Sequence, residues 1–272
     1  MNYQLLDEGV LRDALVGQVA GLDVVAVTGS TNADLLAAAR AGAPDRTVLV
    51  AERQDRGRGR LDRTWLSPPG VGLTFSVLLR PTGVPSARLG WLPLLAGLSV
   101  VRAIRELGTG VQVALKWPND VLLGPDEGKC AGILAEADPG AEGGPAVVIG
   151  IGLNVDTPVA ELPQGATSLH AEGPRVERGE LLIGLLRRLL ADESEWRAAG
   201  GDPDAGGLRE AYRRACATLG REVRVSLPDG SALLARTCAL DADGRLVLRE
   251  RSGATRAVAA GDVVHVRAPD TL

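Results

Sequence analysis

The sequence predicts a protein of mixed helices and strands that ends in a small antiparallel β-barrel. β-branched runs alternate with alanine- and leucine-rich stretches through most of the 272 residues. From Arg221 onward, short apolar runs are separated by turn pairs such as Asp243-Gly244. Turns at a spacing of roughly 8–12 residues are typical of small antiparallel β domains. Hydrophobic residues make up 45% of the chain, which is enough for a sizeable core.

The individual elements follow from apolar periodicity and from turn residues. Strands are expected at residues 23–28, 47–51, 72–79, 111–115, 121–123, 129–137 and 146–155, and helices at residues 5–19, 33–41, 86–107, 178–196 and 208–219. Ser30, Thr31 and Asn32 end the first strand and open a helix, because short polar side chains cap helix N-termini well. Ser86 is expected to cap a second helix, with Pro93 in its first turn. Residues 161–173 are expected to form a loop.

Bulk composition excludes several classes of protein. The formal net charge of −4 counts against a dedicated nucleic-acid-binding protein. Three cysteines, Cys130, Cys216 and Cys238, lack metal-binding spacing, so free thiols in a reducing, cytoplasmic setting are expected. The N-terminus lacks a signal-peptide pattern. No run of 18 apolar residues occurs, so no membrane span is expected.

Residues 52–65, ERQDRGRGRLDRTW, are called the arginine segment below. Between residues 56 and 63 it carries four arginines and two glycines. Guanidinium groups match carboxylates and phosphates, and glycines leave the backbone free to change shape. The segment therefore predicts a mobile loop that closes over an anionic ligand. A solvated basic loop, or an RNA-binding arginine-glycine segment, is the alternative.

The two lysines of the chain, Lys116 and Lys129, lie in KWPND (116–120) and GKCAGIL (128–134). Lys116 could hold a phosphate, and Asn119 and Asp120 could bind hydrated Mg²⁺. Lys129 enters an apolar strand, where an unpaired charge is costly unless an anion meets it. An ordinary proline turn and an edge lysine that reaches water are the alternatives. Neither a phosphate loop nor a dinucleotide-binding fingerprint is present.

Taken in order, Ser30-Thr31-Asn32, Gln54 with GRGRLDRTW, KWPND, GKCAGIL and GIGLNV (150–155) resemble the biotin protein ligase family. The resemblance implies an α+β fold related to class II aminoacyl-tRNA synthetases, with a mixed sheet, flanking helices on one side, and a small SH3-like β-barrel. It also implies two half-reactions. Biotin and ATP give biotinoyl-5′-AMP, and a lysine of a biotin carboxyl carrier domain then takes the biotinoyl group. Mg²⁺ is expected with ATP.

The same resemblance implies roles for individual residues. The catalytic residues would be Lys129, Arg58 and Lys116. Biotin would be bound by Ser30, Thr31, Asn32, Gln54, Arg58, Gly59, Arg60, Lys129 and Gly132. The nucleotide would be bound by Arg60, Arg63, Trp65, Lys116, Asn119 and Asn154, and the metal by Asn119 and Asp120. Ile133 and Ile151 would line the biotin pocket. The thiols, Cys130 included, are expected to be inert.

Two features distinguish this sequence from some members of the family. Asp62 stands where the family usually has glycine, which puts an anion beside the anion-binding arginines. Only about 29 residues precede Ser30, so no DNA-binding domain and no nucleic-acid partner are expected. We expect a catalytic domain over residues 1–219 and a C-terminal β domain over residues 220–272. Monomer and homodimer both remain open, and a lipoate or octanoyl ligase or transferase is the alternative function.

Overall fold

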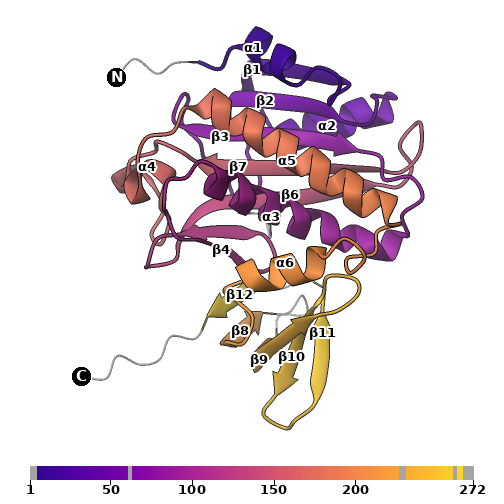
Figure 1. Cartoon of the computed structure of the whole chain (residues 1–272), viewed down its shortest axis with the longest axis vertical. Helices are drawn as coiled ribbons and strands as arrows, with labels where there is room; N and C mark the ends of the chain where they lie inside the picture. The colour runs from indigo at the N-terminus through magenta and orange to yellow at the C-terminus, as the bar shows by residue number, and fades with distance from the viewer. Residues whose placement is uncertain (1–4, 61–62, 227–230, 260–261, 266–272) are drawn as a thin grey trace.

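The computed structural model describes residues 5–60, 63–226, 231–259 and 262–265, and places them in two sheets with flanking helices (Figure 1). The larger sheet has the strand order β1 (Gly21–Thr28), β2 (Thr47–Gln54), β3 (Gly72–Leu79), β7 (Ala146–Asn154), β6 (Gly128–Asp138), β5 (Asp120–Leu123) and β4 (Val113–Lys116). β1 and β2 are parallel, and the other neighbours are antiparallel. The prediction of a mixed sheet is confirmed.

The second sheet contains the C-terminal strands and is antiparallel throughout. Its strand order is β11 (Thr255–Val258), β10 (Leu246–Glu250), β9 (Ala232–Leu240), β8 (Glu222–Ser226) and β12 (Asp262–His265). This arrangement confirms the small antiparallel β structure that the turn spacing predicted, and with it the α+β class.

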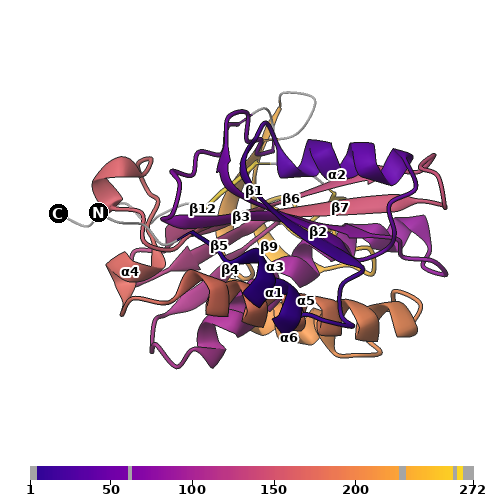
Figure 2. The ribbon, with the colours of Figure 1, turned by 90° about the horizontal axis from the view of Figure 1, so that it is seen from above.

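Helices cover both faces of the large sheet (Figure 2). One face carries α1 (Glu8–Ala14), α3 (Trp91–Glu106), α5 (Arg178–Ala198) and α6 (Leu208–Ala215), and the other carries α2 (Thr31–Arg40). The expectation of helices on one side is therefore wrong for α2. The reason is visible in β2, where Val48 and Val50 belong to the main core and Leu49 packs with Leu35 of α2. A strand that is apolar on both faces must be covered on both.

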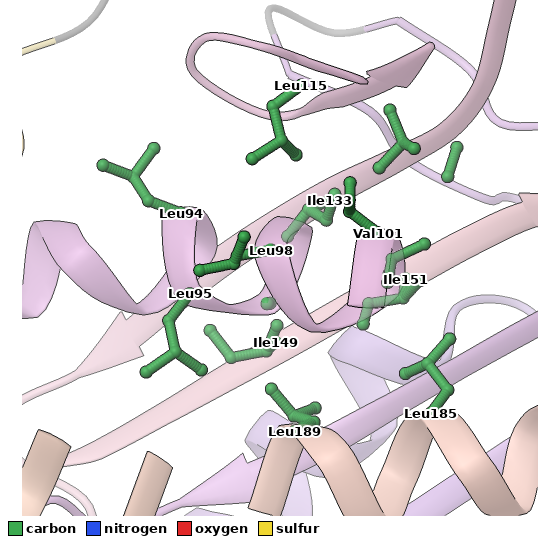
Figure 3. Packing of buried hydrophobic residues seen from close by; sticks show 14 of the residues in the cluster. Leu94, Leu95, Leu98, Val101, Leu115, Ile133, Ile149, Ile151, Leu185 and Leu189 are labelled. Atoms are coloured by element: carbon green, nitrogen blue, oxygen red, sulfur yellow. The ribbon is translucent and has the colours of Figure 1, made fainter. Parts of the chain in front are cut away.

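The main core lies between the sheet, α3 and α5 (Figure 3). Leu98 and Val101 of α3, Ile149 of the sheet and Leu189 of α5 all belong to this core. Each fully buried side chain of this size contributes about 1.5–3 kcal/mol. Residues Ser86–Glu106 have the length and hydropathy of a membrane span, but 67% of the 18-residue apolar stretch within them is buried inside the protein. This apolar stretch is the central core helix.

Three local predictions need correction. The stretch predicted as one helix over 86–107 begins as the 3₁₀ helix η1 (Ser86–Gly90), and no side chain caps it, so Ser86 is not an N-cap. α6 ends at Ala215 and not at residue 219 as predicted, because the backbone of Cys216 is extended and forms a β-bridge with Leu115 of β4. The loop predicted over 161–173 contains the short helix α4 (Leu169–Glu172), capped by Ser168. It follows the 3₁₀ helix η2 (Val159–Glu161).

The two sheets are joined through buried tryptophans. The backbone N–H of Trp117 donates to Thr218 Oγ1 at 3.0 Å, and its indole N–H donates to the Gly244 carbonyl at 3.1 Å. Trp91 donates to the Ala242 carbonyl at 2.8 Å. A buried indole N–H needs an acceptor, and here the C-terminal sheet supplies it. The KWPND turn is therefore held from the C-terminal side.

His265 joins the same contact region. Its Nε2 lies 3.0 Å from Thr218 Oγ1, and its Nδ1 lies 3.2 Å from Arg221, which also forms an ion pair with Glu127. Burial lowers the pKa of His265, and the positive charges of Lys116 and Arg221 lower it further. The folded protein therefore favours the neutral ring.

This shift predicts a pH-dependent loss of stability. Below about pH 6.5, the unfolded chain takes up a proton on His265 before the folded chain does, so stability falls until pH passes the lowered folded pKa. In His265→Gln, the thermal unfolding midpoint should fall less between pH 7 and pH 5 than in wild type. Equal drops in the two proteins would contradict the assignment.

Candidate functional site

A cavity lies on the α2 face of the large sheet, at the N-terminus of α2 and beneath the arginine segment. It encloses about 860 Å³ of empty space, including its open mouth, which is within the range of small-molecule sites. Its described lining residues are Ser30, Thr31, Asn32, Gln54, Arg58, Gly59, Arg60, Arg63, Thr64, Trp65, Thr74, Phe75, Lys116, Trp117, Pro118, Asn119, Asp120, Lys129, Gly132, Ile133, Leu134, Gly150, Ile151, Gly152 and Val263.

Glycines make the hollow in the floor of this cavity. Gly132 of β6 pairs with Gly152 of β7 in the sheet register. A Cβ on Gly152 would lie 2.2 Å from the Trp65 ring, and a Cβ on Gly150 would lie 2.2 Å from Asn32 Oδ1. Both distances are far below van der Waals contact. The glycines therefore let Trp65 and Asn32 lie directly against the sheet at the floor of the cavity.

The first turn of α2 forms a polar wall. Ser30 caps the helix by accepting from the Ala33 N–H. The Thr31 backbone N–H and hydroxyl both donate to Gln54 Oε1, at 2.8 and 3.0 Å. The Ser76 hydroxyl lies 2.7 Å from Thr31 Oγ1 and 2.7 Å from Asn32 Oδ1. This buried network holds several donors and acceptors in place for a small polar group.

A β-bulge directs Lys129 into the cavity. Val121 pairs with Ala131, but the next residue of β5 pairs with Lys129, so Cys130 is the extra residue. Strict alternation would place Lys129 on the core side with Ala131. Instead, Cys130 and Ala131 both belong to the core, and Lys129 lines the cavity beside Gly132. Re-aiming a side chain is a typical effect of a bulge.

Three cations of the cavity lining, Lys129, Arg60 and Arg58, have polar partners. Lys129 Nζ lies 2.7 Å from Asp120 Oδ1 and 6.0 Å from the Trp65 ring centroid. Arg60 donates to Asn119 Oδ1 at 3.1 Å. Arg58 forms an ion pair with Glu136 at 3.1 Å. Asn119 is itself held by donating to the Ile133 carbonyl at 3.1 Å.

The charge balance of the cavity is the reverse of that of the chain. Its described lining includes five cationic side chains and one carboxylate, namely Arg58, Arg60, Arg63, Lys116, Lys129 and Asp120. The protein has a formal net charge of −4. A cleft with this local excess of positive charge attracts anions, and its low-dielectric walls strengthen the attraction.

The arginine segment folds back on itself over the cavity. Arg58 forms a β-bridge with Thr64, and the Trp65 N–H donates to the Gly57 carbonyl at 3.0 Å. A Cβ on Gly57 would lie 2.3 Å from the Trp65 carbonyl oxygen, so this position requires glycine. Asp62, the departure from the family pattern, lies outside the described residues, and so does Leu61.

The structure brings nearly all predicted site residues to this one cavity. Asn154 is the exception, since it is not among the lining residues. Its amide donates to the Thr167 carbonyl at 3.0 Å, and its own carbonyl accepts from Cys130. Asn154 shares the face of β7 that carries Gly150 and Gly152, but it stands at the end of the strand, where its amide is bonded to Thr167 and not directed into the cavity. The Cys130 thiol is fully buried, and burial raises its pKa, which fits an inert thiol.

Sequence reasoning missed several lining residues. Thr74 is buried, and its hydroxyl has no hydrogen-bond partner within the described part of the chain; the same is true of the Trp65 indole N–H. Buried polar atoms of this kind are available to a ligand. Val263 reaches the cavity from β12 of the other sheet. Thr74 and Ser76 are alternate polar residues in an apolar strand, and this pattern could have indicated that both face a polar site. No local pattern marks Val263.

Comparison with known proteins gives matches along most of the chain. The Biotin/lipoate A/B protein ligase family model matches residues 24–156, and the Biotin protein ligase C terminal domain model matches residues 218–266. A biotin–[acetyl-CoA-carboxylase] ligase of Mycobacterium tuberculosis is 44% identical over 269 residues, which is 96% of each protein. A bifunctional ligase/repressor of Bacillus subtilis is 31% identical over 91% of this chain and 76% of its own length.

A solved structure of a biotin protein ligase from Aquifex aeolicus, in complex with biotin and ATP, shares the fold. Its TM-score is 0.72 at 30% sequence identity, over 92% of this chain and 100% of the other. The family matches cover both sheets, and the relative from Mycobacterium tuberculosis is similar from end to end. The chain therefore belongs to the biotin/lipoate A/B protein ligase family.

Proposed function

We propose that the protein joins biotin to a lysine of a biotin carboxyl carrier domain, using ATP and passing through biotinoyl-5′-AMP. One observation carries the proposal: a single cavity combines a glycine floor, a polar helix N-terminus and five cationic side chains. The match to a biotin protein ligase C-terminal domain and the names of the similar proteins favour biotin over lipoate.

The first half-reaction requires two anions to meet. The biotin carboxylate oxygen bonds to the α-phosphorus of ATP, and the bond from that phosphorus to the β-phosphate oxygen breaks, releasing pyrophosphate. Cationic side chains reduce the repulsion and stabilise the charge of the transition state. Lys129 is proposed to move from Asp120 to the reacting oxygens, because its amine is a flexible point charge. Arg58 and Arg60 would cover the same atoms from the arginine segment.

Biotin is proposed to lie along the glycine floor. Its ureido group would face the wall formed by Ser30, Thr31 and Asn32 with Gln54. Gly132 would allow the ring system to approach the sheet closely. The apolar tail would pass Ile133 and Ile151 toward Lys129. A buried polar wall rejects ligands that cannot satisfy it, which gives specificity.

ATP is proposed to bind at the Lys116 side of the cavity. Trp65 offers an aromatic face for adenine, and Arg63 and Lys116 offer charge to the phosphates. No group of three or more His, Cys, Asp or Glu side chains converges among the described residues. Mg²⁺ is therefore proposed to arrive with ATP and to keep several waters, with Asn119 and Asp120 as the nearest oxygen donors. Asn154 is left out of this proposal, because its amide is bonded to Thr167.

In the second half-reaction, the acceptor lysine nitrogen bonds to the biotinoyl carbonyl carbon. The carbon–oxygen bond to phosphate breaks, the amine loses a proton, and AMP leaves. The mixed anhydride must be shielded from water meanwhile, which is the proposed task of the arginine segment. We further propose a boundary between residues 219 and 220, a cytoplasmic location consistent with three free cysteines, and an acetyl-CoA carboxylase carrier domain as partner.

The direct test is incubation with ATP, Mg²⁺ and a biotin carboxyl carrier domain. With biotin, mass spectrometry should show one biotinoyl group on the carrier; with lipoate in place of biotin, the carrier mass should not change. Transfer of lipoate without transfer of biotin would replace the proposal by its nearest alternative. No transfer of either would contradict ligase activity.

Lys129→Ala should slow biotin-dependent pyrophosphate release by about 10²–10³-fold, the typical cost of losing one group that stabilises transition-state charge. The thermal unfolding midpoint should change little, since the side chain is partly exposed. Arg53→Ala is the matched control, because this exposed cation pairs with Asp55 outside the cavity lining. Unchanged pyrophosphate release in Lys129→Ala would refute the catalytic role.

Gly150→Ala should weaken biotin binding by about tenfold, because the new methyl group displaces the Asn32 amide from its hydrogen bonds. Isothermal titration with biotin measures this effect. Gly21→Ala is the control: this glycine also lies in a strand, but a Cβ there meets nothing within 4 Å. An equal loss of affinity in both variants would show that the floor position is not special.

A further inference from the structure

Glu136 of β6 is two residues beyond Leu134 of the cavity lining; it contacts Asn32 and Arg58 but is not itself a lining residue. We propose that Glu136 is a positioning residue for the ligase reaction: its carboxylate orients Asn32 in the polar wall and holds Arg58 of the arginine segment against that wall. The proposal rests on the proposed function and adds a residue that no sequence motif had singled out.

The contact with Asn32 fixes the orientation of an amide. Asn32 Nδ2 donates to Glu136 Oε2 at 2.8 Å and to the Leu134 carbonyl at 3.2 Å. Asn32 Oδ1 lies 2.7 Å from the Ser76 hydroxyl. An ionised carboxylate can only accept hydrogen bonds, so Glu136 requires the NH₂ group of Asn32 on its side. The Asn32 oxygen is thereby directed toward Ser76 and the floor at Gly150.

The contact with Arg58 connects the arginine segment to the sheet. Arg58 Nη2 lies 3.1 Å from Glu136 Oε1 and 3.3 Å from Oε2. The Arg58 side chain is 50% exposed and that of Glu136 is 25% exposed. Water and salt therefore weaken this ion pair. A contact of modest strength suits a segment that must release its product.

The same carboxylate oxygen, Oε2, accepts from both Asn32 and Arg58. The polar wall and the arginine segment are thus joined through one group, although residues 32 and 58 belong to different elements. Correct seating of Arg58 and correct orientation of Asn32 are therefore favoured together. Loss of the carboxylate should loosen the cover over biotinoyl-5′-AMP and also disturb the recognition of biotin.

β6 supplies a matched control two residues further along. Asp138 forms an ion pair with Arg40 at the C-terminal end of α2, at 2.6 Å. Glu136 and Asp138 therefore both join β6 to polar groups of α2 residues, at opposite ends of the helix. Neither Asp138 nor Arg40 lines the cavity. Asp138→Asn removes a comparable ion pair without touching the proposed site.

The experiment compares Glu136→Gln, Glu136→Ala and Asp138→Asn with wild type in adenylate formation and adenylate release. Glu136→Gln keeps an acceptor oxygen for Asn32 but loses the charge that holds Arg58. It should leave the KM for biotin within about twofold and speed adenylate release by about threefold to fivefold. Glu136→Ala should also raise the KM for biotin by about tenfold, because the buried Asn32 amide loses one of its two acceptors.

The dependence of the adenylate release rate on ionic strength distinguishes this positioning role from a merely structural one. Adenylate release from wild type should accelerate as salt is raised, and release from Glu136→Gln should respond less. Asp138→Asn should match wild type in KM, release rate and salt response. Wild-type values in both Glu136 variants, or the same defects in Asp138→Asn, would overturn the proposal. Absence of adenylate with wild type would instead refute the proposed function itself.

Discussion

The Lys129–Asp120 ion pair is the interaction on which the arrangement of the site depends. An amine that enters an apolar sheet loses part of its hydration, and a carboxylate partner offsets that loss. The bulge at Cys130 moves Lys129 to the open face, and the β5–β6 register places Asp120 directly opposite Gly132. The partner is therefore fixed by strand pairing, while the lysine side chain stays long and flexible. The ammonium group of Lys129 therefore has a carboxylate partner before any ligand binds.

Two faces of one sheet serve opposite purposes. Toward α3, the side chains of Val77, Ile149 and Leu153 form a close-packed core, where each missing methyl group would be costly. Toward α2, glycines and short polar side chains leave a hollow. Because α2 covers only part of that face and begins at the cavity, its N-terminal N–H groups and polar cap lie beside the hollow. The packed core on one face stabilises the sheet, so the opposite face can hold a ligand-sized cavity.

Most of the candidate site could be predicted from contiguous motifs. What could not be predicted is which residues from distant parts of the chain lie next to those motifs in the fold. The turn at Ser30 and the segments around Lys116 and Lys129 each carry their chemistry within a few residues. Asn154 lies on the same strand face as Gly150 and Gly152 but outside the cavity lining, because it stands at the end of β7 and its amide donates to the Thr167 carbonyl. Val263 was missed because it reaches the cavity from the other sheet. Glu136 was missed because it meets the site only through its contacts with Asn32 and Arg58. Covering of both sheet faces was also missed, since apolar alternation does not say which helix lies where.

The C-terminal sheet takes part in this geometry through contacts rather than through a motif. Trp117 is buried between Thr218 and Gly244 and lies next to the turn that carries Asn119 and Asp120. Two hydrogen bonds to a rigid indole-bearing residue limit the movement of that turn. Val263 of β12 also lines the cavity, as Trp117 does. Because the wall that would meet ATP is supported from the second sheet, the two sheets are best understood as parts of one site, even though each has its own hydrogen-bonded strand order.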